Sequence, residues 1–300
     1  MFFMHLISVL DIEDRLEEII DGAIKLKGER YSEELKGKSL AMIFEKSSTR
    51  TRVSFEVAMT QLGGHALYLS PEQMQMGRGE TVEDTARVLS RFVDGIMYRA
   101  FSHEMMTKLA ESASVPVINA LDDVEHPCQI VADLQTIKEK KKKLKGLKLA
   151  YVGDGNNVCN SLLLGCPVVG MDISVGCPKG YEPSYADKAK KLAKKYGARV
   201  EILNDPAKAA EGADAVYTDV WVSMGMEKER AERERIFMPY QVNKELTAHA
   251  KKNFIFMHCL PAHRGLEVSA EIMDGKNSVV FDEAENRLHA QKAILLELLA

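Results

Sequence analysis

Short apolar runs alternate with longer segments of helical periodicity along the whole chain. The apolar runs favour β-strands at Ser39–Glu45, His65–Ser70, Val93–Arg99, Val115–Ala120, Leu147–Gly153, Val168–Val175, Arg199–Leu203, Ala215–Asp219, Phe254–His258 and Val279–Asp282. The segments between them favour helices, among them Asp11–Lys27, Thr51–Leu62, Thr81–Arg91, His103–Glu111, Tyr185–Tyr196 and Glu227–Phe237. Strands that alternate with helices of this length predict an α/β fold of doubly wound parallel sheets.

The number of strands exceeds what one sheet comfortably holds, so we expect two α/β domains. A chain of 300 residues, 46% of them hydrophobic, agrees with this division, because a domain usually holds roughly 100–200 residues. We expect the boundary near the lysine-rich segment 138–145, which ends a predicted helix. Lysines near a helix C-terminus interact favourably with the helix dipole, and Gly146 is a typical stop. The predicted domains are residues 1–137 and 138–283.

The charge and cysteine content exclude several classes of protein. The 40 Lys and Arg against 44 Asp and Glu give a net charge of −4, which excludes an evenly basic nucleic-acid binder. The five cysteines are odd in number and form no CxxC pair, so neither a disulfide framework nor a zinc knuckle is expected. No apolar stretch is long enough to cross a bilayer, and the apolar N-terminus lacks the cationic region of a signal peptide. We therefore expect a cytoplasmic protein with no nucleic-acid or membrane partner.

The densest group of candidate ligands is Ser48–Arg52, which follows a predicted strand and opens a predicted helix. Free backbone N–H groups and the positive end of the helix dipole make such a turn an anion site. Three hydroxyls and two guanidinium groups add further donors, and arginine suits the bidentate geometry of phosphate. A single hydroxyl would be enough to cap the helix, so the segment predicts a phosphate-binding turn.

Two more polar positions follow strands of the same predicted sheet. Arg99 ends one strand, and the segment 126–129 (His-Pro-Cys-Gln) follows the next. Ligands of open α/β sheets bind beyond the carboxyl ends of the strands, which places Arg99 on the same rim as Ser48–Arg52. Proline at the first helical position puts His126 at the helix start, with Gln129 one turn on. Taken alone, Arg99 is equally consistent with a surface residue, and His126 with an ordinary helix flank.

In the second predicted domain, polar turns again follow strands. Gly153–Val158 half-matches a dinucleotide-binding fingerprint, with Asp172 further on. Val158 stands where the fingerprint has its third glycine, which disfavours nucleotide binding. The turn still directs Asn157 to the rim of the sheet. Asp219, with small residues behind it, suits recognition of a cationic amine or, alternatively, caps the next helix.

The last polar group, His258–Gly265, also follows a predicted strand. His258, Cys259 and His263 are ligand types, but a fourth ligand is missing and adjacent His and Cys rarely chelate one ion, so we expect no metal. Neither a glycine-rich oxyanion turn nor a paired Asp or Asn accompanies Cys259. A positioned thiol is therefore expected rather than a covalent nucleophile.

Together these segments resemble the aspartate/ornithine carbamoyltransferase superfamily, and most closely its ornithine-using branch, along essentially the whole chain. Ser-Thr-Arg-Thr-Arg at 48–52 and His-Pro-Cys-Gln at 126–129 mark the superfamily. Asp219 with Ser-Met-Gly at 223–225, and His-Cys-Leu-Pro at 258–261, distinguish the ornithine-using branch from the aspartate-using one.

The resemblance implies an architecture and a set of site residues. It implies two doubly wound parallel-sheet domains with the active site in the cleft between them, and a C-terminal helix, 284–300, that packs back on the first domain. Carbamoyl phosphate would bind to Ser48, Thr49, Arg50, Thr51, Gln75, Arg99, His126, Gln129, Cys259, Leu260 and Arg287, with Arg99, His126 and Cys259 acting in catalysis. L-Ornithine would bind to Asn157, Asp219, Ser223 and Met224.

The resemblance also implies an assembly and a reaction without cofactors. Gln75 matches a position that reaches the phosphate of a neighbouring subunit, so a homotrimer or an assembly of trimers is implied. Leu260–Pro261 would be a cis peptide. The reaction would transfer a carbamoyl group to the δ-amine of ornithine, with neither a metal nor an organic cofactor.

Other activities stay open on the residues alone. A sister carbamoyltransferase could act on putrescine or N-acetylornithine. Aspartate is disfavoured because its second carboxylate would need a basic loop where Ser223-Met224-Gly225 stands. A dehydrogenase using NAD would have to be built on the turn at Gly153, and Val158 argues against it.

Overall fold

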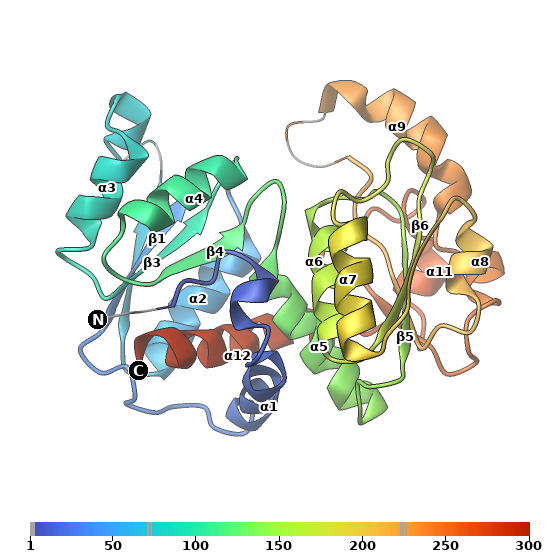
Figure 1. Ribbon diagram of the computed structural model, residues 1–300, viewed down its shortest axis with the longest axis horizontal. Coiled ribbons are helices and arrows are strands. Elements are labelled where there is room, and N and C mark those ends of the chain that lie inside the picture. The colour runs from blue at the N-terminus through green and yellow to red at the C-terminus, as the bar shows by residue number, and fades with distance from the viewer. Residues whose placement is uncertain (1–3, 71, 73, 223–224, 226) are drawn as a thin grey trace. The chain divides into compact units, whose positions relative to one another are not determined.

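The chain forms two structural units in the computed structural model, which describes residues 4–70, 72, 74–222, 225 and 227–300. One unit comprises Met1–Gln135 with Glu285–Ala300, and the other comprises Thr136–Ala284. Each boundary falls inside a helix (Figure 1): α5 (Pro127–Lys141) leaves the first unit, and α12 (Val280–Leu299) returns to it.

The first unit is built on a parallel sheet of four strands, β1 (Ser39–Phe44), β2 (His65–Leu69), β3 (Gly95–Arg99) and β4 (Val117–Leu121). The strand order is β2-β1-β3-β4. Phe44 of β1 lies opposite Arg99 of β3, and the β3–β4 pairing shifts between Tyr98 and Arg99. The carboxyl ends of β1 and β3 therefore meet at one edge, at the point where the strand order reverses.

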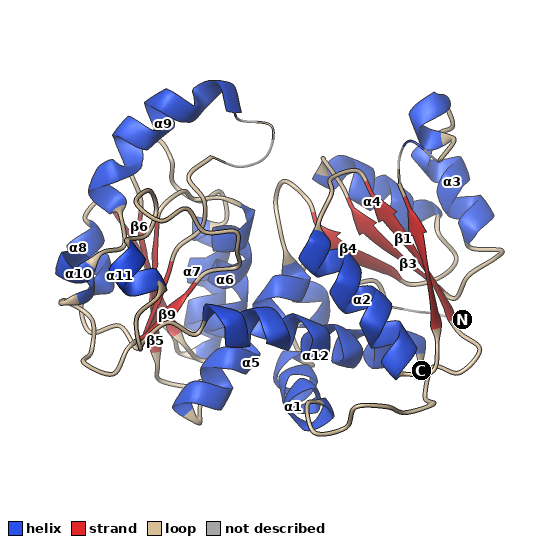
Figure 2. Cartoon of the chain, turned by 180° about the vertical axis from the view of Figure 1, so that it is seen from behind, coloured by secondary structure: helices blue, strands red, loops and turns tan. Residues whose placement is uncertain are grey.

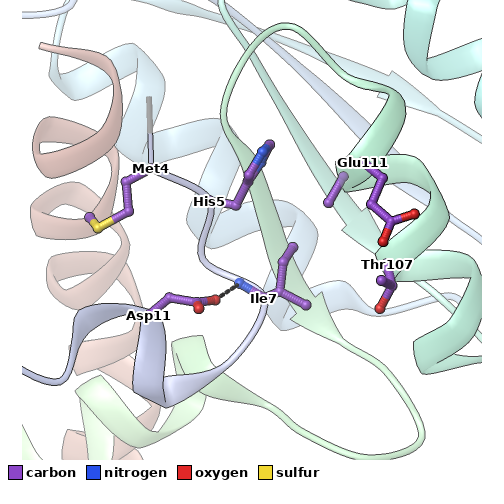
Figure 3. A pocket seen from close by; sticks show the side chains of 7 residues that line it. Met4, His5, Ile7, Asp11, Thr107 and Glu111 are labelled. Carbon is purple, nitrogen blue, oxygen red and sulfur yellow. Dashed lines mark hydrogen bonds between the residues drawn. The ribbon is translucent and has the colours of Figure 1, made fainter. Parts of the chain in front are cut away.

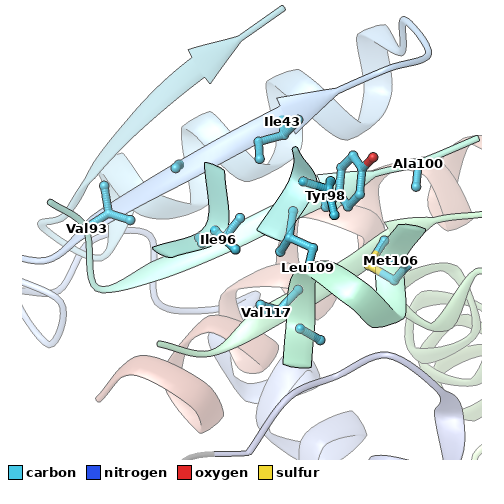
Figure 4. Close-up of a cluster of buried hydrophobic side chains, with 12 residues drawn as sticks. Ile43, Val93, Ile96, Tyr98, Ala100, Met106, Leu109 and Val117 are labelled. Carbon is cyan, nitrogen blue, oxygen red and sulfur yellow. The ribbon is translucent and has the colours of Figure 1, made fainter. Parts of the chain in front are cut away.

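Helices cover both faces of this sheet. They are η1 (Val9–Ile12), α1 (Leu16–Leu26), α2 (Thr49–Gln61), η3 (Met76–Arg78), α3 (Val82–Leu89) and α4 (His103–Ser112). Figures 1 and 2 show α3 and α4 on one face and α2 on the other. Under α3 and α4 lies an apolar core that includes Ile43, Tyr98 and Leu109 (Figure 4). On the opposite face, Leu299 of α12 packs against Gly95.

The second unit is built on a parallel sheet of five strands, β5 (Lys148–Val152), β6 (Asp172–Gly176), β7 (Val200–Leu203), β8 (Ala215–Tyr217) and β9 (Ile255–Met257). Their order, β7-β6-β5-β8-β9, reverses direction at β5. The connecting helices are α6 (Asn157–Val168), α7 (Ala186–Tyr196), α8 (Pro206–Ala210), η4 (Glu227–Glu229), α9 (Arg230–Phe237), η5 (Met238–Tyr240), α10 (Lys244–Thr247) and α11 (Ala270–Met273).

The structure confirms the predicted class, an α/β fold with two parallel sheets, but corrects two predicted strands. Val279–Asp282 is not a strand: only a single bridge joins Ser278 to Phe256, and α12 begins at Val280. Two acidic residues in the first turn of α12 favour the helix there, since they complement its dipole. The strand predicted at Val168–Val175 begins later, because α6 continues to Val168.

In the described part of the chain, no helix combines the length and the apolar character needed to cross a membrane.

Candidate active site

The first part of the site is the N-terminus of α2, directly after β1. Ser48 is extended, and its Oγ accepts a hydrogen bond from the Thr51 N–H (3.3 Å), so Ser48 caps the helix. Thr49 is exposed and Arg50 is half-buried. The turn thus presents the N-terminus of a 13-residue helix together with hydroxyl and guanidinium donors. Such a turn can bind a phosphate group.

The second part is a cluster of buried polar side chains around Arg287 of α12. One Arg287 nitrogen donates to the Gln129 Oε1 (2.8 Å), and another donates to the Thr51 Oγ1 (3.3 Å). Gln129 in turn donates to Asp133 (2.8 Å). Arg99, at the end of β3, is also buried. The structure therefore joins the predicted residues Thr51, Gln129 and Arg287 by hydrogen bonds.

His126 precedes α5 and is buried beside two arginines. Burial, together with the nearby Arg287 and Arg99 charges, holds the pKa of His126 well below its ordinary value. The imidazole is therefore neutral at physiological pH. A neutral imidazole beside guanidinium groups suits a hydrogen-bond donor to an oxygen that gains negative charge.

A carboxylate network shapes the loop that leads to His126. The fully buried Asp122 accepts the backbone N–H of Glu125 (2.7 Å). Glu125 accepts the Ser8 hydroxyl (2.7 Å) and the Val9 N–H (3.0 Å), which ties this loop to the N-terminal segment. Burial raises the pKa of Glu125 to about 7, although both hydrogen bonds oppose the shift. The position of His126 therefore depends on residues at the start of the chain.

Gln75 lies outside these hydrogen-bonded groups. It is exposed and precedes η3, and its carbonyl accepts the N–H groups of Arg78 and Glu80. Among the described residues, the hydrogen bonds that join Thr51, Gln129 and Arg287 do not extend to Gln75.

In the second unit, Asp219 follows β8 and is buried. One of its oxygens accepts the Cys259 thiol (3.1 Å), and the other accepts the Asn156 amide (2.8 Å). Asn157 is half-buried at the first position of α6, and its Oδ1 accepts the N–H of the next residue (2.9 Å). The structure therefore brings Asp219 and Cys259 together.

The loop after Cys259 has an unusual backbone. Leu260–Pro261 is a cis peptide, as the sequence resemblance implied, and Leu260 has a positive φ of 62°. The Leu260 N–H donates to His258 Nδ1 (2.9 Å), so this ring nitrogen carries no proton. The ring of His258 thus supports the loop that carries Cys259.

Two buried carboxylates hold His258. Its Nε2 lies 3.4 Å from Glu267, and its backbone N–H donates to Glu283 (3.0 Å). Glu267 also accepts the His263 N–H. Burial opposes ionisation of Glu267, but the hydrogen bonds from His258 and His263 outweigh it and lower the pKa of Glu267. These contacts hold His258 in place, so that its ring supports the loop that carries Cys259.

Asp219, His258 and Cys259 form the one group of metal-ligand type found among the described residues, with ligand atoms within 4.8 Å of one another. The group has three members, whereas structural zinc takes four ligands. His258 Nδ1 accepts a backbone N–H, and the Cys259 thiol donates to Asp219. Metal binding would break both contacts, so the geometry favours a hydrogen-bonded group.

The predicted residues Ser223 and Met224 lie outside the described residues, but the chain before them is anchored. The Arg233 Nε donates to the carbonyl of Trp221 (2.5 Å), and Arg233 also forms a buried ion pair with Asp154. Its guanidinium lies over the ring of Phe237, 5.2 Å from the centroid. Burial raises the pKa of Asp154 to about 6 despite Arg233.

Several residues that support the site were not predicted from the sequence, among them Asp154, Asn156, Arg233, Glu267 and Glu283, as well as Glu125 and Asp133. Asp154 and Asn156 stand in the turn after β5. The partial dinucleotide fingerprint in this turn is a pattern of glycines, so it predicts nothing about the polar side chains between them. Arg233 belongs to a highly charged helix and carries no local signal. Glu267 and Glu283 act on His258 only through the tertiary fold.

A separate cavity of about 460 Å³ lies beside the N-terminal segment (Figure 3). None of the predicted site residues lines it; its lining is Met4, His5, Ile7, Asp11, Thr107, Ala110 and Glu111. The carboxylate of Asp11 accepts the Ile7 N–H (2.7 Å).

Comparison with family models matches nearly the whole chain. Residues 4–139 match "Aspartate/ornithine carbamoyltransferase, carbamoyl-P binding domain". Residues 145–298 match "Aspartate/ornithine carbamoyltransferase, Asp/Orn binding domain".

Curated relatives are similar along their full length. "Ornithine carbamoyltransferase" of Picrophilus torridus is 61% identical over 297 residues, covering 98% of this chain and 99% of the relative. "Ornithine carbamoyltransferase, catabolic" of Thermoplasma volcanium is 59% identical over 299 residues, covering 98% of both.

Solved structures of ornithine carbamoyltransferases have a fold similar to that of this chain. The ornithine carbamoyltransferase structure from Pyrococcus furiosus matches with a TM-score of 0.95 and 52% identity, covering 99% of this chain and 97% of that one. The anabolic ornithine carbamoyltransferase structure from Campylobacter jejuni matches with a TM-score of 0.92 and 42% identity, covering 97% of each chain.

Proposed function

Since the chain belongs to the aspartate/ornithine carbamoyltransferase family, we propose that it transfers the carbamoyl group of carbamoyl phosphate to the δ-amine of L-ornithine, forming L-citrulline and phosphate. The observation that carries this proposal is the 61% identity, over nearly the full length of both chains, to a curated ornithine carbamoyltransferase. The two groups of site residues fit the chemistry of the two substrates.

The first unit is proposed to bind carbamoyl phosphate. Its phosphate group is an anion, which suits Ser48, Thr49, Arg50 and Thr51 at the start of α2. The carbamoyl group would face Arg99, His126, Gln129 and Arg287, together with Cys259 and Leu260. Gln129 is held by Arg287 and Asp133, so its amide is oriented before any substrate binds.

The second unit is proposed to bind L-ornithine through Asn157, Asp219, Ser223 and Met224. Asp219 offers a buried carboxylate to an ammonium group, and the thiol of Cys259 shares this carboxylate. Binding to one enzyme holds both substrates in position, so the entropy of a bimolecular encounter is lost on binding rather than in the reaction step.

In the proposed reaction, the lone pair of the neutral δ-amine attacks the carbamoyl carbon and forms a C–N bond. Negative charge builds on the carbonyl oxygen, where Arg99 and the neutral His126 donate hydrogen bonds. The bond from carbon to the phosphate oxygen then breaks, and phosphate leaves with the electron pair. The amine proton goes to the departing phosphate, so the reaction balances without a redox step.

Cys259 is proposed to orient the amine rather than to attack the substrate. Its thiol donates to Asp219, and this hydrogen bond holds the sulfur beside the carboxylate proposed to bind ornithine. Mass spectrometry of enzyme quenched during turnover is expected to show unmodified Cys259. A carbamoylated Cys259 would contradict this role.

A homotrimer, or an assembly of trimers, is also proposed, with Gln75 of one subunit reaching the phosphate site of the next. Gln75 is exposed, as such a contact requires. β2 is an edge strand, and Leu67 on it and Val53 on α2 are 41% and 52% exposed. Exposed apolar side chains, on this edge strand and on α2, favour association with a second copy.

The test is citrulline formation by purified protein from carbamoyl phosphate and ornithine, with putrescine, N-acetylornithine and aspartate in parallel. Selective turnover of ornithine, compared by kcat/KM, is the expected result. Preference for another amine would keep the phosphate site but overturn the assignments in the second unit. No turnover with any amine would overturn the proposed function.

A further inference from the structure

Asn156 joins three elements of the second unit through one side chain. Its Oδ1 accepts the N–H groups of Val158 and Cys159 (3.1 Å each) and the hydroxyl of Tyr151 (3.2 Å). Its Nδ2 donates to Asp219 (2.8 Å). Asn156 is therefore at once the N-cap of α6 and a donor to the carboxylate proposed to bind ornithine.

These contacts fix which end of the amide faces Asp219. Three donors converge on Oδ1, so the reversed amide would place its NH₂ group against them. The nitrogen must therefore face Asp219. The other oxygen of Asp219 accepts the Cys259 thiol (3.1 Å), so donors from two different loops hold both carboxylate oxygens.

We propose that Asn156 is a positioning residue, which fixes the plane of the Asp219 carboxylate and, through it, the direction of the Cys259 thiol. The catalytic consequence rests on the proposed function, but the geometric role does not. Asparagine is required because the position needs an acceptor for α6 and a donor for Asp219 at the same time. An ionised aspartate supplies only acceptors, and serine is too short to serve both.

The first variant is Asn156→Asp, which keeps the helix cap because Asn and Asp cap almost equally well. It places a second carboxylate against Asp219. At pH 8, kcat/KM for ornithine is expected to fall about 10- to 100-fold, the usual effect of losing a hydrogen bond to a charged group. KM for carbamoyl phosphate should change less than about threefold, since Asn156 lies among the proposed ornithine ligands.

The pH profile of this variant separates positioning from a merely structural defect. Two carboxylates within hydrogen-bond distance share one proton as the pH falls, and the shared O–H then replaces the lost amide donor. The ratio of variant to wild-type kcat/KM should therefore rise from pH 8 to pH 6. A loss that is equal at every pH, or no loss, would overturn the proposal.

A matched pair of serine variants controls for loss of the cap. Asn243 caps α10 by accepting the Leu246 N–H (3.0 Å), and its substitution Asn243→Ser keeps a capping hydroxyl in the same way as Asn156→Ser. Asn156→Ser should lower kcat/KM for ornithine, and Asn243→Ser should not. Equal effects of the two on kcat/KM would contradict a specific role for Asn156.

Alkylation of Cys259 tests the geometry without any turnover. Cys259 is half-buried and the other four cysteines are buried, so iodoacetamide should label Cys259 first. In Asn156→Asp, the added negative charge disfavours the thiolate, so labelling at pH 8 should slow about 3- to 10-fold.

The two readouts distinguish the two proposals. If wild type converts ornithine but Asn156→Asp keeps both its kcat/KM and its labelling rate, the role of Asn156 is wrong. If wild type forms no citrulline but labelling slows as expected, the proposed function fails and the positioning role stands.

Discussion

Burial shifts the pKa values of two adjacent residues, Glu125 and His126, in opposite directions. It raises the pKa of Glu125 to about 7, and it holds the pKa of His126 well below the ordinary value, with Arg287 and Arg99 adding to the effect. Both shifts favour the neutral form of the side chain, because a charge loses its hydration on burial. The segment that enters α5 is therefore close to neutral below pH 7, next to two arginines.

Glu125 should make the stability of the protein depend on pH. Its pKa is raised in the folded state, so its stabilising contribution is complete below the unfolded value of 4.5 and is lost as the pH rises through about 7. The expected decrease in the free energy of unfolding is on the order of 3 kcal/mol across this window. Urea denaturation between pH 4.5 and pH 8 should show that Glu125→Gln removes this decrease. Glu111→Gln, at an exposed glutamate, should retain it, and parallel curves for wild type and Glu125→Gln would contradict the argument.

His126 should act as a neutral donor. His126→Ala is expected to lower kcat about 100- to 1000-fold, which is the usual loss when one donor to a developing oxyanion is removed. His126→Asn keeps an N–H donor and should recover part of the rate. Because the imidazole is neutral already, kcat between pH 6 and pH 8 should not follow its protonation. An alanine variant with wild-type kcat would overturn this role.

At the scale of elements, α12 is held to the first unit by polar contacts rather than by an apolar face alone. Lys292 is buried, and its Nζ donates to the backbone carbonyls of Glu29 (2.6 Å) and Leu26 (3.4 Å) at the end of α1. Asn286 accepts the Lys27 ammonium (2.9 Å) in the same region. These contacts fix the helix that carries Arg287.

Loss of the Lys292 ammonium should destabilise the protein. Lys292→Met keeps much of the side-chain volume but removes the ammonium that donates to the backbone carbonyl of Glu29. The free energy of unfolding should decrease by about 1–3 kcal/mol, the usual penalty for buried polar groups without partners. Lys276→Met, at an exposed lysine, should change it by less than about 0.5 kcal/mol. Equal unfolding midpoints for the two variants would show that the α1 contact contributes nothing.

The elements that sequence patterns predicted well are the strands formed by continuous apolar runs. Strands such as β1 and β3 are continuous apolar runs buried on both faces, and the pattern located them within a residue or two. The pattern failed at Val279–Asp282, where an apolar pair opens a helix whose buried side also carries polar residues. A helix of this kind has no clear polar face, so periodicity could not mark its start.

At the scale of the whole molecule, sequence separation decides what could be predicted of the candidate site. Arg99 and Asp219 stand at strand ends, where parallel sheets place ligands, so the strand pattern predicted them. Arg287 and Gln129 are 158 residues apart and meet only in the folded chain, and the resemblance to the family supplied Arg287. Asn156 donates to Asp219, and Glu125 ties the loop before His126 to Ser8, through hydrogen bonds that no local pattern encodes.

The proposed trimer predicts that damaged subunits restore one another. Gln75→Ala should impair the site of the neighbouring subunit, whereas Arg50→Ala should impair the site of its own. Each variant alone should lose at least about tenfold in kcat/KM for carbamoyl phosphate, as expected for lost contacts to an anion.

In a trimer reassembled from equal amounts of the two variants, about a quarter of the sites combine an intact Arg50 with an intact Gln75 from the neighbour. Refolding the variants together should therefore restore about a quarter of the wild-type activity, whereas refolding each alone should restore only its own residual activity, at most about a tenth. Light scattering on the same samples should give the mass of a trimer or of a multiple of it. Trimers that recover no activity on mixing would show that Gln75 acts within its own subunit or not at all, because subunit exchange is the only way in which these two variants can form an intact site.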